Sequence, residues 1–279
     1  MKPGDFFDYV PLERARLRVV SVVDGLLIAG SLGILIGWFT GHPVLYSPTS
    51  PVMSPFTALS LLLMAVTRQA RLHISTWPMV LSLAMSGLVL GGNASSIVML
   101  TTMPAELWTS FPDMVLTSVM TSVGLVLFCA YDLIVAARET PDSAFIVDDL
   151  LVHLALVPGG LSLLGYLLGN PTYLSIHADP RVGISPLEMA FLGLYAVAAV
   201  VSNPRLFLWQ FLAAGWSSRL VFGLLFVNQF VAPLVVALFL ARPGTAGPGP
   251  ELFVMLAGVM TTLSFLLFEA RVARRKVTA

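Results

Sequence analysis

The sequence predicts an all-α polytopic membrane protein with eight transmembrane helices and both termini in the cytoplasm. Two observations define the class: 57% of the 279 residues are hydrophobic and only 11% are charged, and the mean hydropathy is +0.89. Soluble domains carry about 25% charged residues. The composition therefore excludes a soluble enzyme, a nucleic-acid-binding protein and a disordered regulator. The numbers of acidic and basic residues are equal, 15 of each, so no net charge attracts a partner.

Long apolar stretches set the expected spans, because about 20 apolar residues in a helix cross a 30 Å hydrocarbon layer. The eight predicted spans are Val19–Phe39, Ser54–Thr67, Trp77–Leu100, Asp113–Ala137, Asp149–Leu168, Pro186–Val201, Leu220–Ala241 and Glu251–Ala270. We expect the short second and sixth spans to extend into their flanks. The loops between spans are too short to bury a soluble core.

Basic residues collect on one side of these predicted spans. Thirteen of the 15 lie at the termini or in the loops on that side, and only Arg181 and Arg242 lie on the other. Cytoplasmic loops carry an excess of Lys and Arg, so both termini are predicted to be cytoplasmic. Short loops and an arginine-rich inner side favour a bacterial inner membrane.

Four short matches recur in the same order in the two halves of the chain. They pair Asp24-Gly-Leu-Leu with Asp149-Leu-Leu, Gly41-His-Pro with Gly169-Asn-Pro, Met53-Ser-Pro with Ile184-Ser-Pro, and Met120–Phe128 with Met260–Phe268. Such self-similarity predicts two four-helix repeats, 1–142 and 143–279. Because four is even, both repeats enter the membrane in the same direction, and a shared site is expected between them.

Ser54 and Ser185 each stand before a proline at the start of a predicted span, which is typical of a helix N-cap. Glu188, three residues after Ser185, completes a capping box, so we interpret both serines as structural caps. The alternative is an anion site, because two helix N-termini present free N–H groups there. His42 and His177 lie in nearby loops and would add positive charge at low pH.

Amide side chains occur inside two of the predicted spans, Asn93 in the third and Asn228 with Gln229 in the seventh. An unpaired amide in hydrocarbon is costly, so these side chains are expected to face protein or a cavity. We interpret them as hydrogen-bonding partners between helices. A contact to a bound ligand or quinone is the alternative.

Acidic residues lie close to the predicted cytoplasmic surface. They are Asp24, Asp132, Asp148, Asp149 and Glu269. Three of them stand near predicted helix starts, where the dipole favours an acid. We expect Asp132 and Glu269 to pair with Arg138 or Arg271, and we favour pairing over a proton relay because the acids lie at shallow depth.

Glycine and proline interrupt the third and fifth predicted spans, at Gly91-Gly92 and at Pro158-Gly159-Gly160. Small residues allow close helix packing or a kink, which is the interpretation we favour. Broken helices that expose backbone to a substrate are the alternative, as in many transporters.

Catalytic motifs are not found in the sequence. Cys129 is the single cysteine, which excludes an internal disulfide and a cysteine-based metal cluster. No phosphate-binding loop, nucleophile motif or metal-binding pair at helical spacing occurs. We therefore predict a protein that is not an enzyme, with no metal and no cofactor, to which a lipid or quinone could bind.

The run Pro51-Val-Met-Ser-Pro-Phe-Thr-Ala-Leu-Ser-Leu-Leu-Leu-Met64 follows an apolar helix and a short exterior turn. It resembles the membrane-embedded sensor regions of bacterial histidine kinases and diguanylate cyclases, where Met-Ser-Pro-x-Thr-Ala-Leu opens a helix after a comparable loop. The resemblance covers about Val19–Ala70 and implies a signal-input module. No kinase or cyclase domain follows, so the resemblance implies action on a separate partner or the membrane portion of a larger protein.

Three functions agree with these features. The first is a non-enzymatic sensor or scaffold that acts through a membrane or cytoplasmic protein partner. The second is a small transporter or lipid-handling protein with a site between the repeats. The third is an accessory subunit of a respiratory or photosynthetic membrane complex. Lipids are expected partners in each case, and nucleic acid is not.

Overall fold

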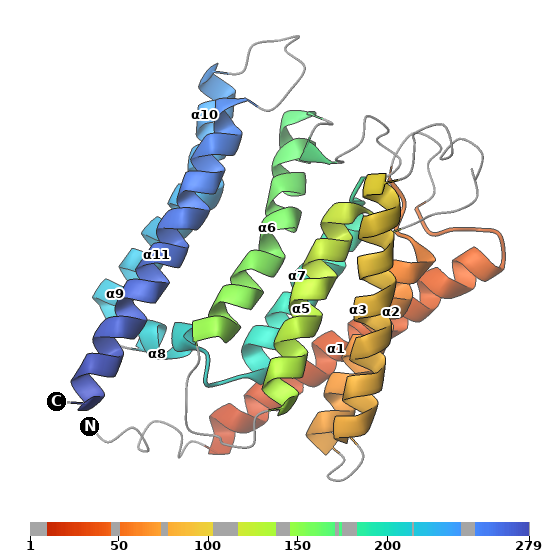
Figure 1. Ribbon diagram of the computed structural model, residues 1–279, viewed down its shortest axis with the longest axis horizontal. Helices are drawn as coiled ribbons and strands as arrows, with labels where there is room; N and C mark the ends of the chain where they lie inside the picture. Colours follow the sequence, from red (N-terminus) through yellow and green to blue (C-terminus); the bar gives the residue numbers. More distant parts are fainter. Residues whose placement is uncertain are drawn as a thin grey trace.

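The computed structural model is a set of helices that run alternately up and down (Figure 1). It describes residues 10–45, 51–73, 78–102, 117–137, 146–170, 173–174, 183–213, 215–240 and 249–278. Every regular element in these ranges is helical. The elements are α1 Val10–Phe39, α2 Pro55–His73, α3 Pro78–Thr102, α5 Val119–Ala137, α6 Ile146–Leu168, α7 Pro186–Ser202, α8 Phe207–Ala213, α9 Trp216–Phe226, the π-helix η3 Val227–Val231, α10 Ala232–Leu240 and α11 Pro250–Thr278.

The long apolar helices support a membrane-embedded protein. Five segments are long and apolar enough to cross a membrane, namely Ala15–Phe39, Val119–Ala137, Ile146–Leu168, Trp216–Phe239 and Pro250–Glu269. Two shorter apolar segments, Ala84–Met99 and Pro186–Ser202, belong to α3 and α7. The first turn of α1 and the last turn of α11 lie at the same end of the molecule (Figure 1). We call this end the terminal end, and the other the opposite end.

Several helices extend beyond the predicted apolar spans. Helix α1 begins at Val10 instead of Val19, α2 ends at His73 instead of Thr67, and α11 continues to Thr278. Hydropathy marks only the part of a helix that lipid can cover, whereas Leu, Arg and Ala in the flanks favour helix in any solvent. One consequence is that Asp24 lies in the middle of α1, so its predicted position near a helix start is wrong.

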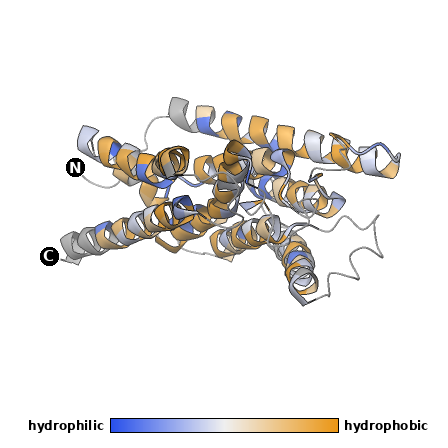
Figure 2. Ribbon diagram, turned by 90° about the horizontal axis from the view of Figure 1, so that it is seen from above, coloured by the Kyte–Doolittle hydropathy of each residue, from blue (hydrophilic) through white to orange (hydrophobic). Residues whose placement is uncertain are grey.

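Four helices, α1, α2, α5 and α7, contribute most of the buried core. Leu27 of α1, Leu61 of α2, Leu125 of α5 and Leu192 of α7 are all at most 2% exposed. Helix α3 packs outside α2 and α5, and α6 packs outside α5 and α7. Apolar residues are distributed along every helix, with few hydrophilic positions between them (Figure 2). The two predicted repeats thus share one core, since α7 of the second half packs against helices of the first.

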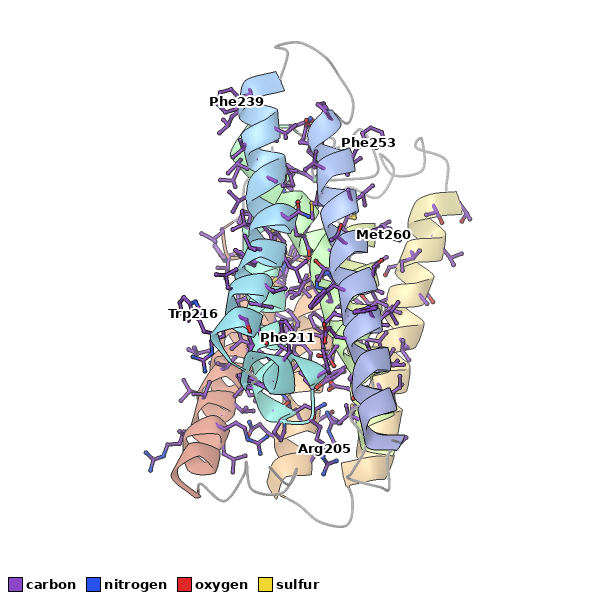
Figure 3. The ribbon with its side chains drawn as sticks, turned by 90° about the vertical axis from the view of Figure 1, so that its left-hand side faces the viewer. Arg205, Phe211, Trp216, Phe239, Phe253 and Met260 are labelled. Carbon is purple, nitrogen blue, oxygen red and sulfur yellow. The ribbon has the colours of Figure 1, made fainter. Side chains whose placement is uncertain are left out.

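The helical hairpin of α9–η3–α10 and α11 lies at the edge of the molecule and packs on the remainder mainly through α6 (Figure 1). Only 17% of the Trp216–Phe239 segment and 22% of Pro250–Glu269 is buried, against 50% of Val119–Ala137. Large apolar side chains such as Trp216, Phe239 and Phe253 project outward (Figure 3). A surface of this kind suits contact with lipid tails or with another membrane helix.

The glycine and proline clusters do not break their helices, because α3 and α6 run through them without interruption. Gly92 faces the ring of Phe56, and Gly160 faces Phe230 and Met255, so closely that an added Cβ atom would overlap them. Close helix packing, the favoured interpretation, is confirmed for these two glycines. The irregular helix is instead at η3, which contains Asn228 and Gln229.

Candidate functional site

Two groups of buried polar side chains lie at the two ends of the four-helix core, and helix α2 contributes to both. The first, which we call the cap network, consists of Ser54, Thr57, Thr117, Ser185 and Glu188. Ser54 Oγ accepts a hydrogen bond from the Thr57 N–H at 3.0 Å, and Ser185 Oγ accepts one from the Glu188 N–H at 3.1 Å. Glu188 Oε2 accepts in return from the Ser185 N–H at 2.8 Å. The capping box predicted at the start of α7 is thus confirmed.

The carboxyl group of Glu188 joins the two predicted repeats. Its Oε1 accepts a hydrogen bond from Thr57 Oγ1 of α2 at 2.8 Å. The Ser54 hydroxyl lies 3.0 Å from both the Thr57 and Thr117 hydroxyls, and the last of these precedes α5. Glu188 is 1% exposed and has no ion pair in the part of the chain that the structure describes.

The starts of three helices explain how a carboxyl group is accommodated there. Helices α2, α5 and α7 all begin at this network, and α5 has its own cap, in which Ser118 Oγ accepts from the Thr121 N–H at 3.0 Å. Helix N-termini carry partial positive charge and favour an anion. The two serines that the sequence suggests for an external anion therefore face the carboxylate of Glu188. His42 is exposed in the loop after α1, and His177 lies outside the described residues.

The second group, the charge network, lies toward the terminal end and consists of Asp24, Arg68, Gln69, Arg71, Asp132 and Tyr195. Arg68 of α2 forms a salt bridge with Asp24 of α1, with Nε at 3.1 Å from both carboxylate oxygens. Gln69 Nε2 donates to the same carboxylate at 2.8 Å. Arg68 is 3% exposed and Asp24 is fully buried. Buried ions of this kind are stable only when paired and hydrogen-bonded.

Asp132 of α5 closes the charge network. Arg71 of α2 donates from Nη2 to Asp132 Oδ1 and from Nη1 to the Asp132 carbonyl oxygen, both at 3.0 Å. The hydroxyl of Tyr195, on α7, donates to the other carboxylate oxygen of Asp132. The Arg68 guanidinium carbon lies 4.2 Å from the centre of the Tyr195 ring, a cation–π contact. The acids on α1 and α5 are thus balanced by the two arginines on α2, and α7 contributes the Tyr195 hydroxyl.

Sequence reasoning missed this charge network. Asp132 was expected to pair with Arg138, which lies outside the described residues, yet its partners are Arg71 and Tyr195. The expectation used residues close in the chain, whereas these contacts need the packing of α2 against α5 and of α5 against α7. A signal was present in the sequence, because Arg68 and Arg71 are three residues apart and so lie on one face of a helix that also carries apolar residues.

The amide residues have different surroundings. Asn93 is fully buried and donates to Ser60 Oγ of α2 at 3.1 Å and to the Val89 carbonyl at 2.8 Å. Gln229 is 2% exposed and accepts from Thr262 of α11 at 3.2 Å. Asn228 is exposed, so the expectation that it faces protein or a cavity is wrong. The π-turn explains this, because an extra residue in the turn presents Gln229 to the neighbouring helix in its place.

Two further acids have roles that the sequence did not reveal. Asp149 accepts hydrogen bonds from the N–H groups of Phe207 and Leu208 at 2.9 and 3.0 Å, and so fixes the start of the short helix α8. Glu251 accepts from the Tyr173 hydroxyl at 2.5 Å, which ties the segment after α6 to the start of α11. Burial and the Glu251 carboxylate raise the pKa of Tyr173 to about 12.

The cap network and the charge network are separated by an apolar layer. Leu61, Leu125, Phe128 and Leu192 fill it and are at most 2% exposed. Among the described residues, no group of three His, Cys, Asp or Glu side chains is placed to hold a metal ion. No family model, curated protein or solved structure matches the chain.

Proposed function

We propose that the chain is a non-enzymatic sensor or scaffold of the bacterial inner membrane that acts through a protein partner. One observation supports this most directly: helix α2 is held near both ends by buried polar contacts, and most of the side chains buried between them are apolar. A packed interior disfavours a substrate site between the two networks. It suits an element that transmits a displacement between its two ends, because packed cores shift between discrete arrangements.

The proposed topology has eight spans with cytoplasmic termini. The helices that support it are α1, α2, α3, α5, α6, α7, the continuous α9–η3–α10 and α11, whose directions alternate along the chain (Figure 1). The basic residues on the terminal side support a cytoplasmic location for that end. In this orientation the charge network lies near the cytoplasm, since Arg68 is five residues, or about 7.5 Å of helix, from the end of α2.

The partner is proposed to sense the relative positions of α1, α2, α5 and α7 at the cytoplasmic side. A buried ion pair contributes little net stability compared with apolar residues, so stability alone is a weak reason for four charges there. The contacts of these charged residues do fix the relative positions of α1, α2, α5 and α7. A displacement of α2 at the cap network would also displace its residues in the charge network.

The test is purification of tagged protein from its native membranes in mild detergent, followed by mass spectrometry of the retained material. We expect a protein partner at fixed stoichiometry. The double substitution Asn93→Leu with Asn228→Leu serves as a control, because it removes the predicted amide ligands without touching either network, and we expect it to keep the partner. A chain recovered without any protein partner would overturn the proposal.

A small transporter is the second candidate. The observation that favours it is the presence of two buried carboxyl groups, Glu188 and Asp132, at opposite ends of the same helix interface. Intramembrane acids of this kind serve proton-coupled transport in many proteins. Vesicles that contain the purified protein and a pH-sensitive dye would test it. Proton uptake that is lost in Glu188→Gln would favour transport over partner binding.

A further inference from the structure

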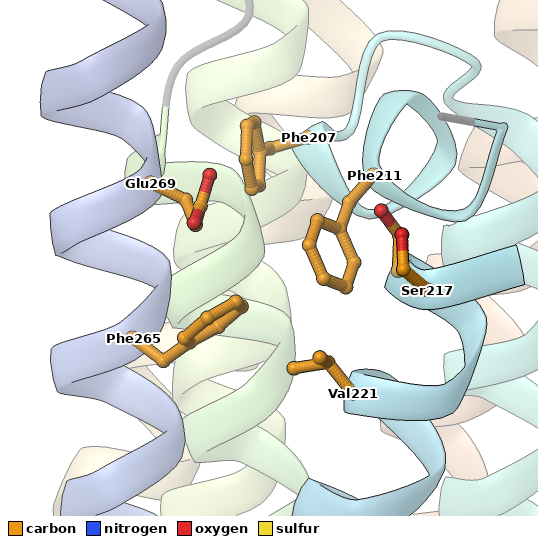
Figure 4. A pocket seen from close by; sticks show the side chains of 7 residues that line it. Phe207, Phe211, Ser217, Val221, Phe265 and Glu269 are labelled. Atoms are coloured by element: carbon orange, nitrogen blue, oxygen red, sulfur yellow. The ribbon is translucent and has the colours of Figure 1, made fainter. Parts of the chain in front are cut away.

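A pocket that neither polar network uses lies between α8, α9 and α11, at the terminal end of the edge hairpin (Figure 4). Its volume is about 370 Å³. This lies within the range of small-molecule sites, which is roughly 300–1,000 Å³. Leu220 and Phe268, each next in sequence to a residue that lines the pocket, are exposed, so apolar surface accompanies the pocket on α9 and α11.

Three aromatic rings form the apolar part of the pocket. Phe207 and Phe211 of α8 are stacked with ring centres 6.1 Å apart, and Phe265 of α11 meets Phe211 edge-on at 5.4 Å. Asp149 accepts hydrogen bonds from the backbone N–H groups at the start of α8, so Phe207 is held in place by a contact outside the pocket. The rings offer both apolar surface and faces that attract a cation.

The polar groups of the pocket are divided between two walls. Glu269 of α11 stands on one side, and Ser217 of α9 stands on the other (Figure 4). Glu269 is half-buried and has no hydrogen bond or ion pair within the described part of the chain. Ser218 also lines the pocket. The exposed Arg219 lies on another face of α9, where its Nε donates to the Leu212 carbonyl at 3.0 Å. One wall of the pocket thus carries an acid, and the other carries hydroxyl groups.

We propose that this pocket binds a phospholipid whose headgroup carries a primary ammonium, such as phosphatidylethanolamine. The ammonium would donate hydrogen bonds to the Glu269 carboxylate and lie against the phenyl rings. The phosphate would accept hydrogen bonds from Ser217 and Ser218, and the acyl chains would follow the exposed apolar faces of α9 and α11. The carboxylate on one wall and the hydroxyl groups on the other match the ammonium and the phosphate of such a headgroup.

The experiment is lipid titration of the purified full chain in detergent, monitored by native mass spectrometry. The probes are phosphatidylethanolamine, phosphatidylcholine and phosphatidylglycerol with identical acyl chains, together with soluble phosphoethanolamine. We expect phosphatidylethanolamine to bind about tenfold more tightly than the other two lipids, because a charge-assisted hydrogen bond distinguishes it. Equal binding of the three lipids, a preference for the choline headgroup, or equal binding of soluble phosphoethanolamine would each overturn the proposal.

Variants locate the binding site. Glu269→Gln and the double change Ser217→Ala with Ser218→Ala are each expected to remove most of the preference, and neither disturbs a buried contact. Phe265→Leu should weaken binding, whereas Phe253→Leu, on the same helix but 70% exposed and far along α11, is the matched control and should not. An unchanged preference in Glu269→Gln, with normal elution on size exclusion, would show that the lipid binds elsewhere.

Discussion

At the residue scale, the most informative side chain is Glu188. It is buried and has no basic partner among the residues that the structure describes, yet it is surrounded by donors: the Ser185 N–H, the Thr57 hydroxyl and the positive ends of three helices. The sequence showed Glu188 as one half of a capping box, which is a local pattern. Its contact with Thr57 joins residues 131 positions apart, and no local pattern could reveal it.

Replacing Glu188 by glutamine tests this account. The substitution turns one acceptor oxygen into an NH₂ group, which then faces the Thr57 hydroxyl or the Ser185 N–H. We expect the free energy of unfolding in detergent to fall by about 1–3 kcal/mol, the cost of one unsatisfied buried group. Glu269→Gln is the control, since its carboxyl has no partner among the described residues, and a similar loss there would contradict the assignment.

Tyr173 allows a second test, by pH. Its raised pKa of about 12 means that the folded state holds the hydroxyl proton more tightly than the unfolded state does. The resulting stability is fully present below the unfolded value near 10, and it is lost as the pH rises through 12. We expect Tyr173→Phe to lower stability by about 1–3 kcal/mol at neutral pH, because Glu251 loses its donor. Unfolding curves of the two proteins should converge above pH 12, and a constant difference would count against the contact.

At the scale of the element, helix ends and internal irregularities differ most from expectation. Each predicted apolar span overlaps a helix of the structure, but α1 begins nine residues earlier than predicted, at Val10, because its arginine-rich flank also favours helix. In the glycine pairs that suggested breaks, Gly92 and Gly160 are packing positions, whereas Gly91 and Gly159 have open space beside them. The real irregularity, η3, contains no glycine or proline, but Pro233 follows it and has no N–H to bond the carbonyl of Gln229 four residues before.

Glycine substitutions test how closely η3 meets α11. A Cβ at Gly258 would lie 2.7 Å from the Gln229 Cα, which is backbone and cannot move aside, whereas a Cβ at Gly223 meets nothing within 4 Å. Gly258→Ala is therefore expected to lower the melting temperature. Gly223→Ala should leave it unchanged or raise stability by up to about 1 kcal/mol, since alanine favours helix. Equal effects at the two positions would refute the close approach.

At the scale of the whole molecule, composition and basic residues predicted a helical membrane protein, and the helices agree. Which helices meet could not be predicted, because lipid-facing and protein-facing surfaces are equally apolar and no hydrophobic pattern separates them. The buried charges of Asp24, Arg68 and Asp132 are therefore the best pointers to the core. The sequence presented them only as residues near a membrane surface.

Topology is tested by cysteine labelling in intact cells with a membrane-impermeant maleimide. His42 and Arg205 are both exposed, and the proposed topology assigns them to opposite sides. We expect His42→Cys to react in intact cells and Arg205→Cys to react only after lysis. The native Cys129 is fully buried and provides an unreactive background. Labelling of both positions from outside would rule out the proposed topology.

The central claim is that the charge network serves transmission to a partner and is not needed for folding. The most direct measurement compares wild type with the double variant Asp24→Leu with Arg68→Met, in unfolding and in co-purification of the partner. Each single change leaves a buried ion unpaired and should cost about 3–5 kcal/mol, while the double change should be close to neutral. We predict that the double variant folds normally and loses the partner. A folded double variant that retains the partner at full stoichiometry would contradict the account.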